Sequence, residues 1–88
     1  MVRYRLLIKA SAAKELQAIR NKRDRQRIVK RIQGLEVDPI PPGSQKLSGR
    51  EKYRIRQEDY RIVYSVEKDV IVVYVVKIGH RNDVYRRL

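Results

Sequence analysis

Apolar and polar residues alternate over positions 2–9, with Arg3, Arg5 and Lys9 between the apolar side chains. A period of two is typical of a strand with one buried face. The pattern therefore predicts a first strand at 2–9. The side chains expected to face the core are Val2, Tyr4, Leu6 and Ile8.

The pattern then changes to a helical period over two segments. Ser11 is a residue type that caps helix N-termini, and strong helix formers follow it over 12–19. A break at 21–23 precedes a second helix, for which Asn21 and Asp24 are both candidate caps. The buried stripes are predicted at Ala12, Leu16 and Ile19 in the first helix and at Ile28, Val29, Ile32 and Leu35 in the second.

Residues 38–44 interrupt the periodic pattern. Pro39, Pro41 and Pro42, followed by Gly43, are incompatible with a helix or a central strand. The segment predicts a connecting loop rather than a linker between domains, because neither flank could form a core alone. We therefore expect one domain over residues 1–88.

Residues 52–64 have strand spacing on both sides of a polar turn at Glu58 and Asp59. A turn centred there places Arg56 opposite Arg61, and a slip of one residue would move every side chain to the other face. The predicted hairpin has one apolar and one cationic face. The apolar face carries Tyr53, Ile55, Ile62 and Tyr64, and the cationic face carries Lys52, Arg54, Arg56 and Arg61.

The last strand is predicted after a turn at 67–69. Residues 70–76 are apolar on both faces, as in a central strand, and Lys77 and Ile78 extend them to Gly79, where a polar tail begins. This order of elements predicts an α+β fold, with two N-terminal helices packed on one face of a small, mostly antiparallel β-sheet. We expect the helices to cover the apolar face of the hairpin and to leave its cationic face open as a shallow basic cleft.

Composition narrows the classes of partner. Lys and Arg total 22 against 10 acidic residues, a formal charge of +12, which points to nucleic acid, an acidic protein or an anionic membrane. A membrane is the weakest of these, because no apolar run could span a bilayer. The chain has no cysteine and one histidine, so we expect no disulfide, metal or cofactor. The lack of a signal-peptide pattern suits a cytoplasmic protein.

Two regions concentrate the positive charge. Arg56 opposite Arg61 is unfavourable in a sheet built only for folding, and a polyanion lying across that face would remove the repulsion. The second helix has few acidic residues to balance its cations. An ordinary solvated surface is the alternative for both regions. The helix cations are Arg23, Arg25, Arg27, Lys30 and Arg31.

Five segments carry recognisable motifs: Gln45–Gly49, Tyr53–Arg56, Asp59–Tyr64, Ile78–Arg81 and Val84–Tyr85. Together with the helix pair and the loop, they resemble the RelE family of toxin–antitoxin toxins over nearly the whole chain. The motifs are more specific for the RelE/ParE superfamily than for its RelE branch.

The resemblance implies a ribosome-dependent endoribonuclease that cleaves mRNA in the ribosomal A site without a metal. In such chemistry the ribose 2′-OH attacks the adjacent phosphate, while cations stabilise the developing charge and other groups transfer protons. Arg61 matches the family arginine at the transition-state phosphate, and Arg54 and Arg56 match the basic pair on the preceding strand. Arg81 matches a second phosphate-binding arginine, and Tyr85 the tyrosine that positions the RNA or stacks on it. Further RNA or phosphate contacts are expected from Lys46, Arg50 and Lys52, and ribosomal RNA contacts from Arg23, Arg27, Lys30 and Arg31.

The positions of Arg54 and Arg56 are lysines in the best-known members of the family. A guanidinium is effectively never deprotonated, so it serves poorly as a general base but well as a phosphate clamp. Histidine is the side-chain type that titrates near neutral pH. We therefore hypothesise that His80 takes part in proton transfer, with a plain loop residue as the alternative. The alternative for Tyr85 is packing of the tail.

The resemblance also implies partners. These are an acidic RelB-like antitoxin, held in a toxin–antitoxin hetero-oligomer, and the ribosome with its mRNA. A ParE-like toxin, which binds DNA gyrase without catalysis, is the first alternative, and the joint presence of the five matched site residues argues against it. A non-catalytic nucleic-acid-binding module is the second alternative.

Overall fold

The computed structural model describes residues 2–47 and 52–80, which form two helices and five strands. The two helices precede four of the five strands, and the α+β class expected from the sequence is confirmed. The elements are β1 (Arg5–Ile8), α1 (Ala10–Gln17), α2 (Lys22–Gly34), β2 (Gln45–Lys46), β3 (Lys52–Gln57), β4 (Tyr60–Glu67) and β5 (Val72–His80).

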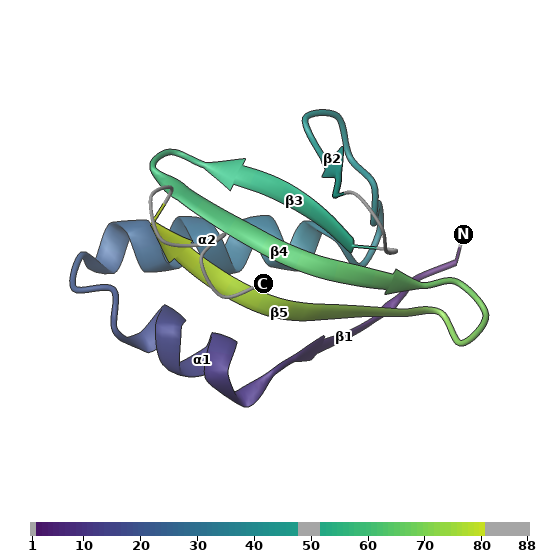
Figure 1. Ribbon diagram of the computed structural model, residues 1–88, viewed down its shortest axis with the longest axis horizontal. Coiled ribbons are helices and arrows are strands. Elements are labelled where there is room, and N and C mark those ends of the chain that lie inside the picture. Colours follow the sequence, from purple (N-terminus) through teal and green to yellow (C-terminus); the bar gives the residue numbers. More distant parts are fainter. Residues whose placement is uncertain (1, 48–51, 81–88) are drawn as a thin grey trace.

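The strands form one sheet in the order β1-β5-β4-β3-β2 (Figure 1). Only the β1–β5 pair is parallel; the β5–β4, β4–β3 and β3–β2 pairs are antiparallel. The register of β4 against β5 shifts between Val63 and Tyr64, which marks an irregularity in the longest pairing of the sheet. The first strand of the chain is therefore joined to the last strand, and β5 occupies an interior position, as its apolar sequence predicts.

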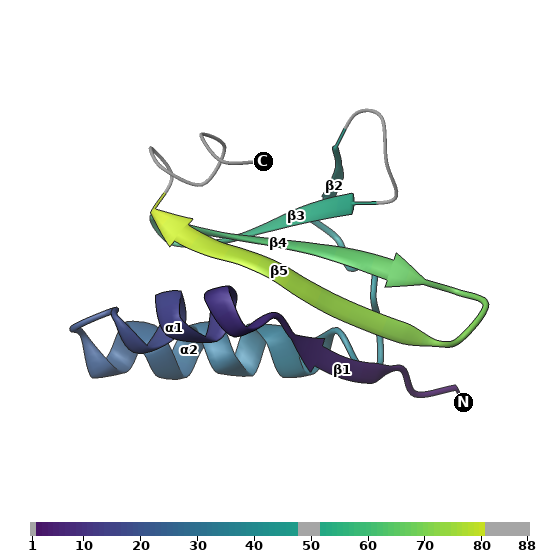
Figure 2. The ribbon, with the colours of Figure 1, turned by 60° about the horizontal axis from the view of Figure 1, so that its bottom comes forward.

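Both helices lie on the same side of the sheet, and Figure 2 shows this two-layer arrangement from the edge. The core forms between the layers, because the apolar stripe of α2 meets one face of the hairpin formed by β3 and β4. Burial of this apolar surface stabilises the packing of the layers. The core residues include Ala12, Ile28, Ile32 and Leu35 from the helical side and Tyr53, Ile55, Ile62, Tyr64, Val73, Val75 and Ile78 from the sheet.

The hairpin has the register that the sequence predicts. Arg56 pairs with Arg61, Ile55 with Ile62, and Gln57 with Tyr60 around the turn at Glu58 and Asp59. Glu58 has a φ of 56°, a left-handed conformation that a tight turn requires. The apolar face of the hairpin packs against the helices, as expected.

The N-terminal strand is shorter than predicted. β1 begins at Arg5, and the side chain of Ile8, expected in the core, is 40 % exposed. β1 is an edge strand and pairs with β5 alone among the described strands, so its other side has no strand neighbour. Tyr4 and Leu6 are half-buried and do pack against the core.

Beyond the end of β1, the side chain of Glu15 in α1 contacts the edge of β5. Its carboxylate accepts a hydrogen bond from the backbone N–H of Ile78 (3.2 Å) and forms an ion pair with Lys77. A carboxylate thus bonds to a main-chain donor that a neighbouring strand would otherwise satisfy. No periodic pattern or motif in the sequence indicates this role of Glu15.

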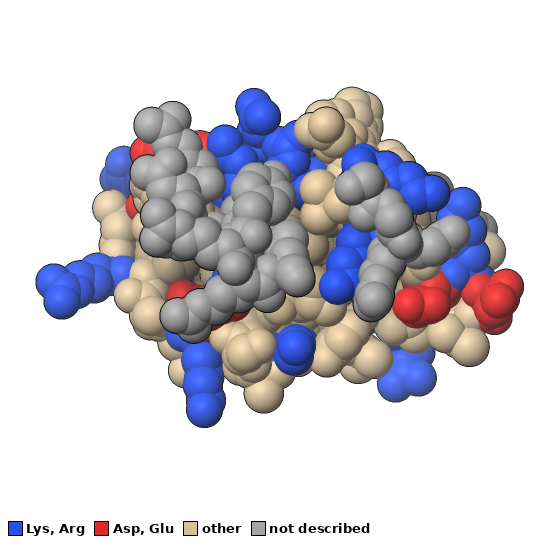
Figure 3. Space-filling model, in the orientation of Figure 1, with Lys and Arg blue, Asp and Glu red and all other residues tan. Residues whose placement is uncertain are grey.

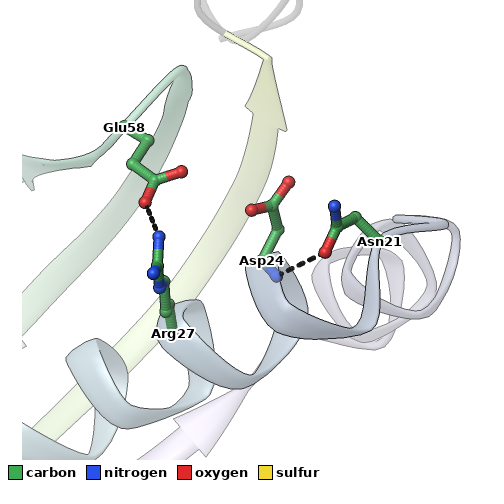
Figure 4. A network of polar contacts seen from close by, with 4 residues as sticks. All are labelled: Asn21, Asp24, Arg27 and Glu58. Carbon is green, nitrogen blue, oxygen red and sulfur yellow. Dashed lines mark hydrogen bonds and ion pairs between the residues drawn. The ribbon is translucent and has the colours of Figure 1, made fainter.

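The two helices differ in how they begin. The prediction that Ser11 caps the first helix is wrong: α1 starts at Ala10, and Lys9 at its N-cap makes no side-chain hydrogen bond. Asn21 caps α2, and its side chain accepts a hydrogen bond from the backbone N–H of Asp24 at 3.1 Å (Figure 4). Of the two candidate caps for the second helix, Asn21 is therefore confirmed.

The end of the sheet differs from prediction at two places. β5 begins at Val72 rather than at Val70, because the turn after β4 extends through Ile71, and Val70 is 65 % exposed. Ile71 itself has a φ of 57°. The short strand β2, which follows the proline-rich loop, was not predicted.

Candidate functional site

The cationic face of the hairpin is built by strand alternation. Arg56 and Arg61 pair across β3 and β4, and both side chains lie on the face away from the helices. Arg56 is exposed and Arg61 is half-buried. The guanidinium of Arg61 donates at 3.3 Å to the backbone carbonyls of Glu58 and Tyr60, so the turn itself orients this side chain. Two guanidinium groups are thus presented together from rigid strands.

Arg54 lies on the same face but does not have the exposure expected of it. The side chain is only 5 % exposed, and its cross-strand partner Val63 is 0 % exposed, so the expectation of an open cleft at this position is wrong. The unpredicted strand β2 pairs with β3 here and places Gln45 directly beside Arg54. The Arg54 Nη2 group donates a hydrogen bond to Gln45 Oε1, whereas Nη1 is buried without a partner in the described part of the chain.

The surface around these residues is basic. Figure 3 views the molecule from the side of the sheet that faces away from the helices: Lys and Arg side chains are spread across this view, while acidic side chains gather mainly near the β4–β5 turn. Lys52 is half-buried at the start of β3, and Lys46 of β2 is exposed. Arg50, Arg81 and Tyr85 lie outside the described residues.

His80 lies on the other face of the sheet from Arg61. It pairs with Tyr60 at the end of β5, and the two rings meet edge to face at a centroid distance of 6.0 Å. Tyr60 packs against the core on the helical side. The register therefore places His80, the residue hypothesised to transfer a proton, on the opposite face of the sheet from Arg56 and Arg61.

The helix cations form a separate basic region. Arg27, Lys30 and Arg31 line a hollow of about 400 Å³ together with Gly34 and Gln57. Arg23, in the first turn of α2, is exposed. The ion pair between Arg27 and Glu58 joins α2 to the β3–β4 turn (Figure 4). The sequence gives no signal for this ion pair, because its partners are 31 positions apart and neither belongs to a periodic pattern.

Behind the cationic face, Tyr64 anchors the hairpin to the proline-rich loop. Its hydroxyl donates a hydrogen bond to the carbonyl of Pro39 at 2.8 Å, and its ring stacks on Tyr53 at 5.9 Å. Burial raises the pKa of the Tyr64 phenol from 10.0 to about 12. The loop that leads into β2 is thereby attached to the strand that carries Arg61.

The arrangement suits binding of phosphate groups. Arginine offers several N–H donors in a planar fork that matches phosphate oxygens, and three arginines occupy neighbouring positions of one sheet face. Within residues 2–47 and 52–80, no group of three or more His, Cys, Asp or Glu side chains is placed to hold a metal ion. No helix in the same residues has the length and apolar character needed to cross a membrane.

Comparisons with known proteins agree with this architecture. Residues 6–85 match the family described as the ParE toxin of a type II toxin–antitoxin system. The archaeal RelE of a RelE–RelB complex from Pyrococcus horikoshii is 31 % identical, with a TM-score of 0.81 over 96 % of this chain and 100 % of that one. Isolated RelE toxin of E. coli is 28 % identical, with a TM-score of 0.76 over 88 % of this chain and 83 % of that one.

The toxin–antitoxin complex RelBE2 of Mycobacterium tuberculosis contains a chain of the same fold at 19 % identity, with a TM-score of 0.79 over 91 % of this chain and 100 % of that one. No curated protein sequence matches the chain.

Proposed function

Because the chain belongs to the RelE/ParE superfamily and is a RelE family toxin of a type II toxin–antitoxin system, we propose that it is a ribosome-dependent endoribonuclease that cleaves mRNA in the A site. The observation that carries the proposal is the cross-strand pair of Arg56 and Arg61 on the face away from the helices. Like charges placed opposite each other cost folding free energy, and a bound phosphodiester would offset that cost.

In the proposed reaction, the ribose 2′-oxygen forms a bond to phosphorus and loses its proton. The bond from phosphorus to the 5′-oxygen breaks, and the leaving oxygen takes up a proton. Negative charge grows on the non-bridging oxygens, and Arg61 and Arg56 are positioned to stabilise it by charge-assisted hydrogen bonds. Arg81 and Tyr85 remain proposed contacts to the RNA.

The mechanism routes no proton through His80, because the register of β4 and β5 places it on the opposite face from Arg61. The arginines of the site cannot replace it as bases, since a guanidinium keeps its proton in proteins. Their contribution is to hold the phosphate and to stabilise charge. We propose that the proton-transfer groups come from the substrate, the ribosome or Tyr85.

The proposed partners follow from charge and from the relatives. The structures from Pyrococcus horikoshii and Mycobacterium tuberculosis are complexes with antitoxins, and a chain of formal charge +12 favours an acidic antitoxin. Ribosome and mRNA are the proposed targets, and the cytoplasm is the proposed location. The helix cations Arg23, Arg27, Lys30 and Arg31 supply a second basic surface for ribosomal RNA.

A gyrase-binding, non-catalytic toxin is the second candidate, and the family match to a ParE toxin favours it. The two candidates differ in the part played by the cationic face. A gyrase-binding toxin requires a surface that contacts protein, whereas an endoribonuclease requires the arginines themselves.

The test is a translation reaction with purified 70S ribosomes and a defined message, with mapping of RNA ends. We expect cleavage in the A-site codon, and Arg61→Ala should lower the cleavage rate by about 10²–10³-fold, the usual effect of removing one donor to a transition-state oxyanion. Arg3→Ala is the matched control, because the Arg3 side chain is exposed and precedes β1, whose first residue Arg5 lies level with the end of β4 away from the hairpin turn. An intact message would contradict the proposal, and inhibition of DNA supercoiling by gyrase would then support the second candidate.

A further inference from the structure

The side chain of Arg54 has an unusual environment for a cation. It is nine-tenths buried or more, yet the three ion pairs among the described residues do not include it. A buried charge is costly unless hydrogen bonds and an opposite charge compensate for it. Within residues 2–47 and 52–80, the one hydrogen-bond partner of the Arg54 side chain is the neutral Gln45, and the Nη1 group has no partner there.

We propose that Gln45 is a positioning residue that holds the Arg54 guanidinium through Nη2 and thereby directs Nη1 toward a phosphate bound on the cationic face. The proposal rests on the proposed function, since the phosphate is that of the RNA substrate. An amide oxygen at position 45 orients the arginine but leaves its positive charge uncompensated. A carboxylate there would orient it equally well and would neutralise it.

The backbone fixes Gln45 for this role. β2 consists of two residues, and its register sets Gln45 against Arg54 and Lys46 against Tyr53. A main-chain hydrogen bond from Leu47 N–H to the Lys52 carbonyl, at 2.8 Å, also holds this strand pair together. A side chain on a paired strand is placed more accurately than one on a loop.

The position of Arg54 in the sheet places it next to Arg56 and Arg61. Residues directly opposite in an antiparallel sheet lie about 5 Å apart, and diagonal neighbours about 7–8 Å, within reach of long side chains. Arg61 is the cross-strand partner of Arg56 and the diagonal neighbour of Arg54. Arg54 Nη1 is buried in this structure, and a phosphodiester that reached it from the cationic face would also lie within reach of Arg56 and Arg61.

The experiment compares Gln45→Glu and Gln45→Ala with the wild-type chain. The probe is a short, fluorescently labelled 2′-O-methyl oligoribonucleotide, which cannot be cleaved because its 2′-oxygen is blocked. Binding is measured by fluorescence anisotropy and thermal stability by circular dichroism. Cleavage on 70S ribosomes gives kcat and KM. Gln17→Glu is the matched control, because it adds the same charge at an exposed position at the end of α1.

We expect Gln45→Glu to keep the melting temperature at or above that of the wild type and to weaken probe binding by about 10-fold or more, since a charge-assisted contact to phosphate is lost. The kcat on ribosomes should fall by a similar factor, whereas Gln17→Glu should change neither quantity beyond a general charge effect. Gln45→Ala should show an intermediate loss, because Arg54 stays cationic but loses its orientation.

A purely structural Gln45 would give the opposite result. Gln45→Glu, which is isosteric and can still accept the Arg54 hydrogen bond, would then bind the probe and cleave like the wild type, and this outcome would overturn the inference. Failure of the wild type to bind the probe would overturn it as well. If the wild type cleaves no message but Gln45→Glu still weakens probe binding selectively, the inference stands and the endoribonuclease proposal fails.

Discussion

The buried phenol of Tyr64 makes the stability of this protein depend on pH in a defined window. Its side chain is 0 % exposed, and burial raises its pKa from 10.0 to about 12. Between those values the unfolded chain gives up the phenol proton and the folded chain keeps it. The folded state therefore binds more protons, and the free energy of unfolding falls as the pH rises from about 10 to about 12.

The size of the effect follows from the two pKa values. At pH 11 the unfolded phenol is about nine-tenths ionised and the folded one about one-tenth, which lowers the free energy of unfolding by about 1.4 kcal/mol relative to pH 7. The variant Tyr64→Phe has no such group. At pH 7 it should be less stable than the wild type by about 1 kcal/mol, because the hydrogen bond to the Pro39 carbonyl is lost.

We expect the difference in free energy of unfolding between the wild type and Tyr64→Phe to disappear as the pH rises. Urea unfolding is measured at intervals from pH 7 to pH 11. The wild type should be more stable than Tyr64→Phe at neutral pH and about equally stable near pH 11. Subtracting one free energy of unfolding from the other at each pH removes the contribution of the titrating groups that both chains contain. Tyr74→Phe, at a half-buried position of β5, controls for removal of a phenol elsewhere in the sheet. A gap for Tyr64→Phe that stays constant from pH 7 to pH 11 would refute the reasoning.

Two further predictions concern the cationic face and the second helix. Arg56→Glu replaces a like-charge pair with an opposite-charge pair against Arg61, so it should raise the free energy of unfolding by about 0.2–1 kcal/mol while abolishing cleavage on ribosomes; a chain that gains stability and retains activity would contradict the assignment. Asn21→Ala removes the acceptor for the Asp24 N–H, and urea unfolding should show a loss of about 1 kcal/mol, whereas Asn21→Ser should restore most of it.

The hairpin could be predicted from the sequence because several independent signals agree there. Alternation fixes the faces of β3 and β4, and polar residues at 58–59 fix the centre of the turn, so the register of Arg56 against Arg61 follows. Family resemblance then gives these arginines a proposed role. The loop at 38–44 could also be predicted from the sequence, because proline restricts the backbone wherever it occurs.

Other parts of the site depend on contacts that no local pattern reveals. β2 has two residues, too few for any periodicity, so the partner of Arg54 could not be found. An arginine in a strand is expected at the surface, and only the tertiary arrangement shows that Arg54 is buried. The face on which His80 lies became clear from the pairing of β4 and β5, since the sequence places it at the border between strand and tail.

The parallel pairing of β1 with β5 has a consequence for the order in which the molecule folds. Leu6 and Val73 are neighbours in the sheet, although about three-quarters of the chain separates them, and Glu15 bonds to the same distant strand. Closing so large a loop is entropically costly and slows folding. The hairpin with Arg56 and Arg61 closes over a few residues. We therefore expect the segment synthesised first to dock last, so that a nascent chain forms its arginine hairpin before the layer that supports it is complete.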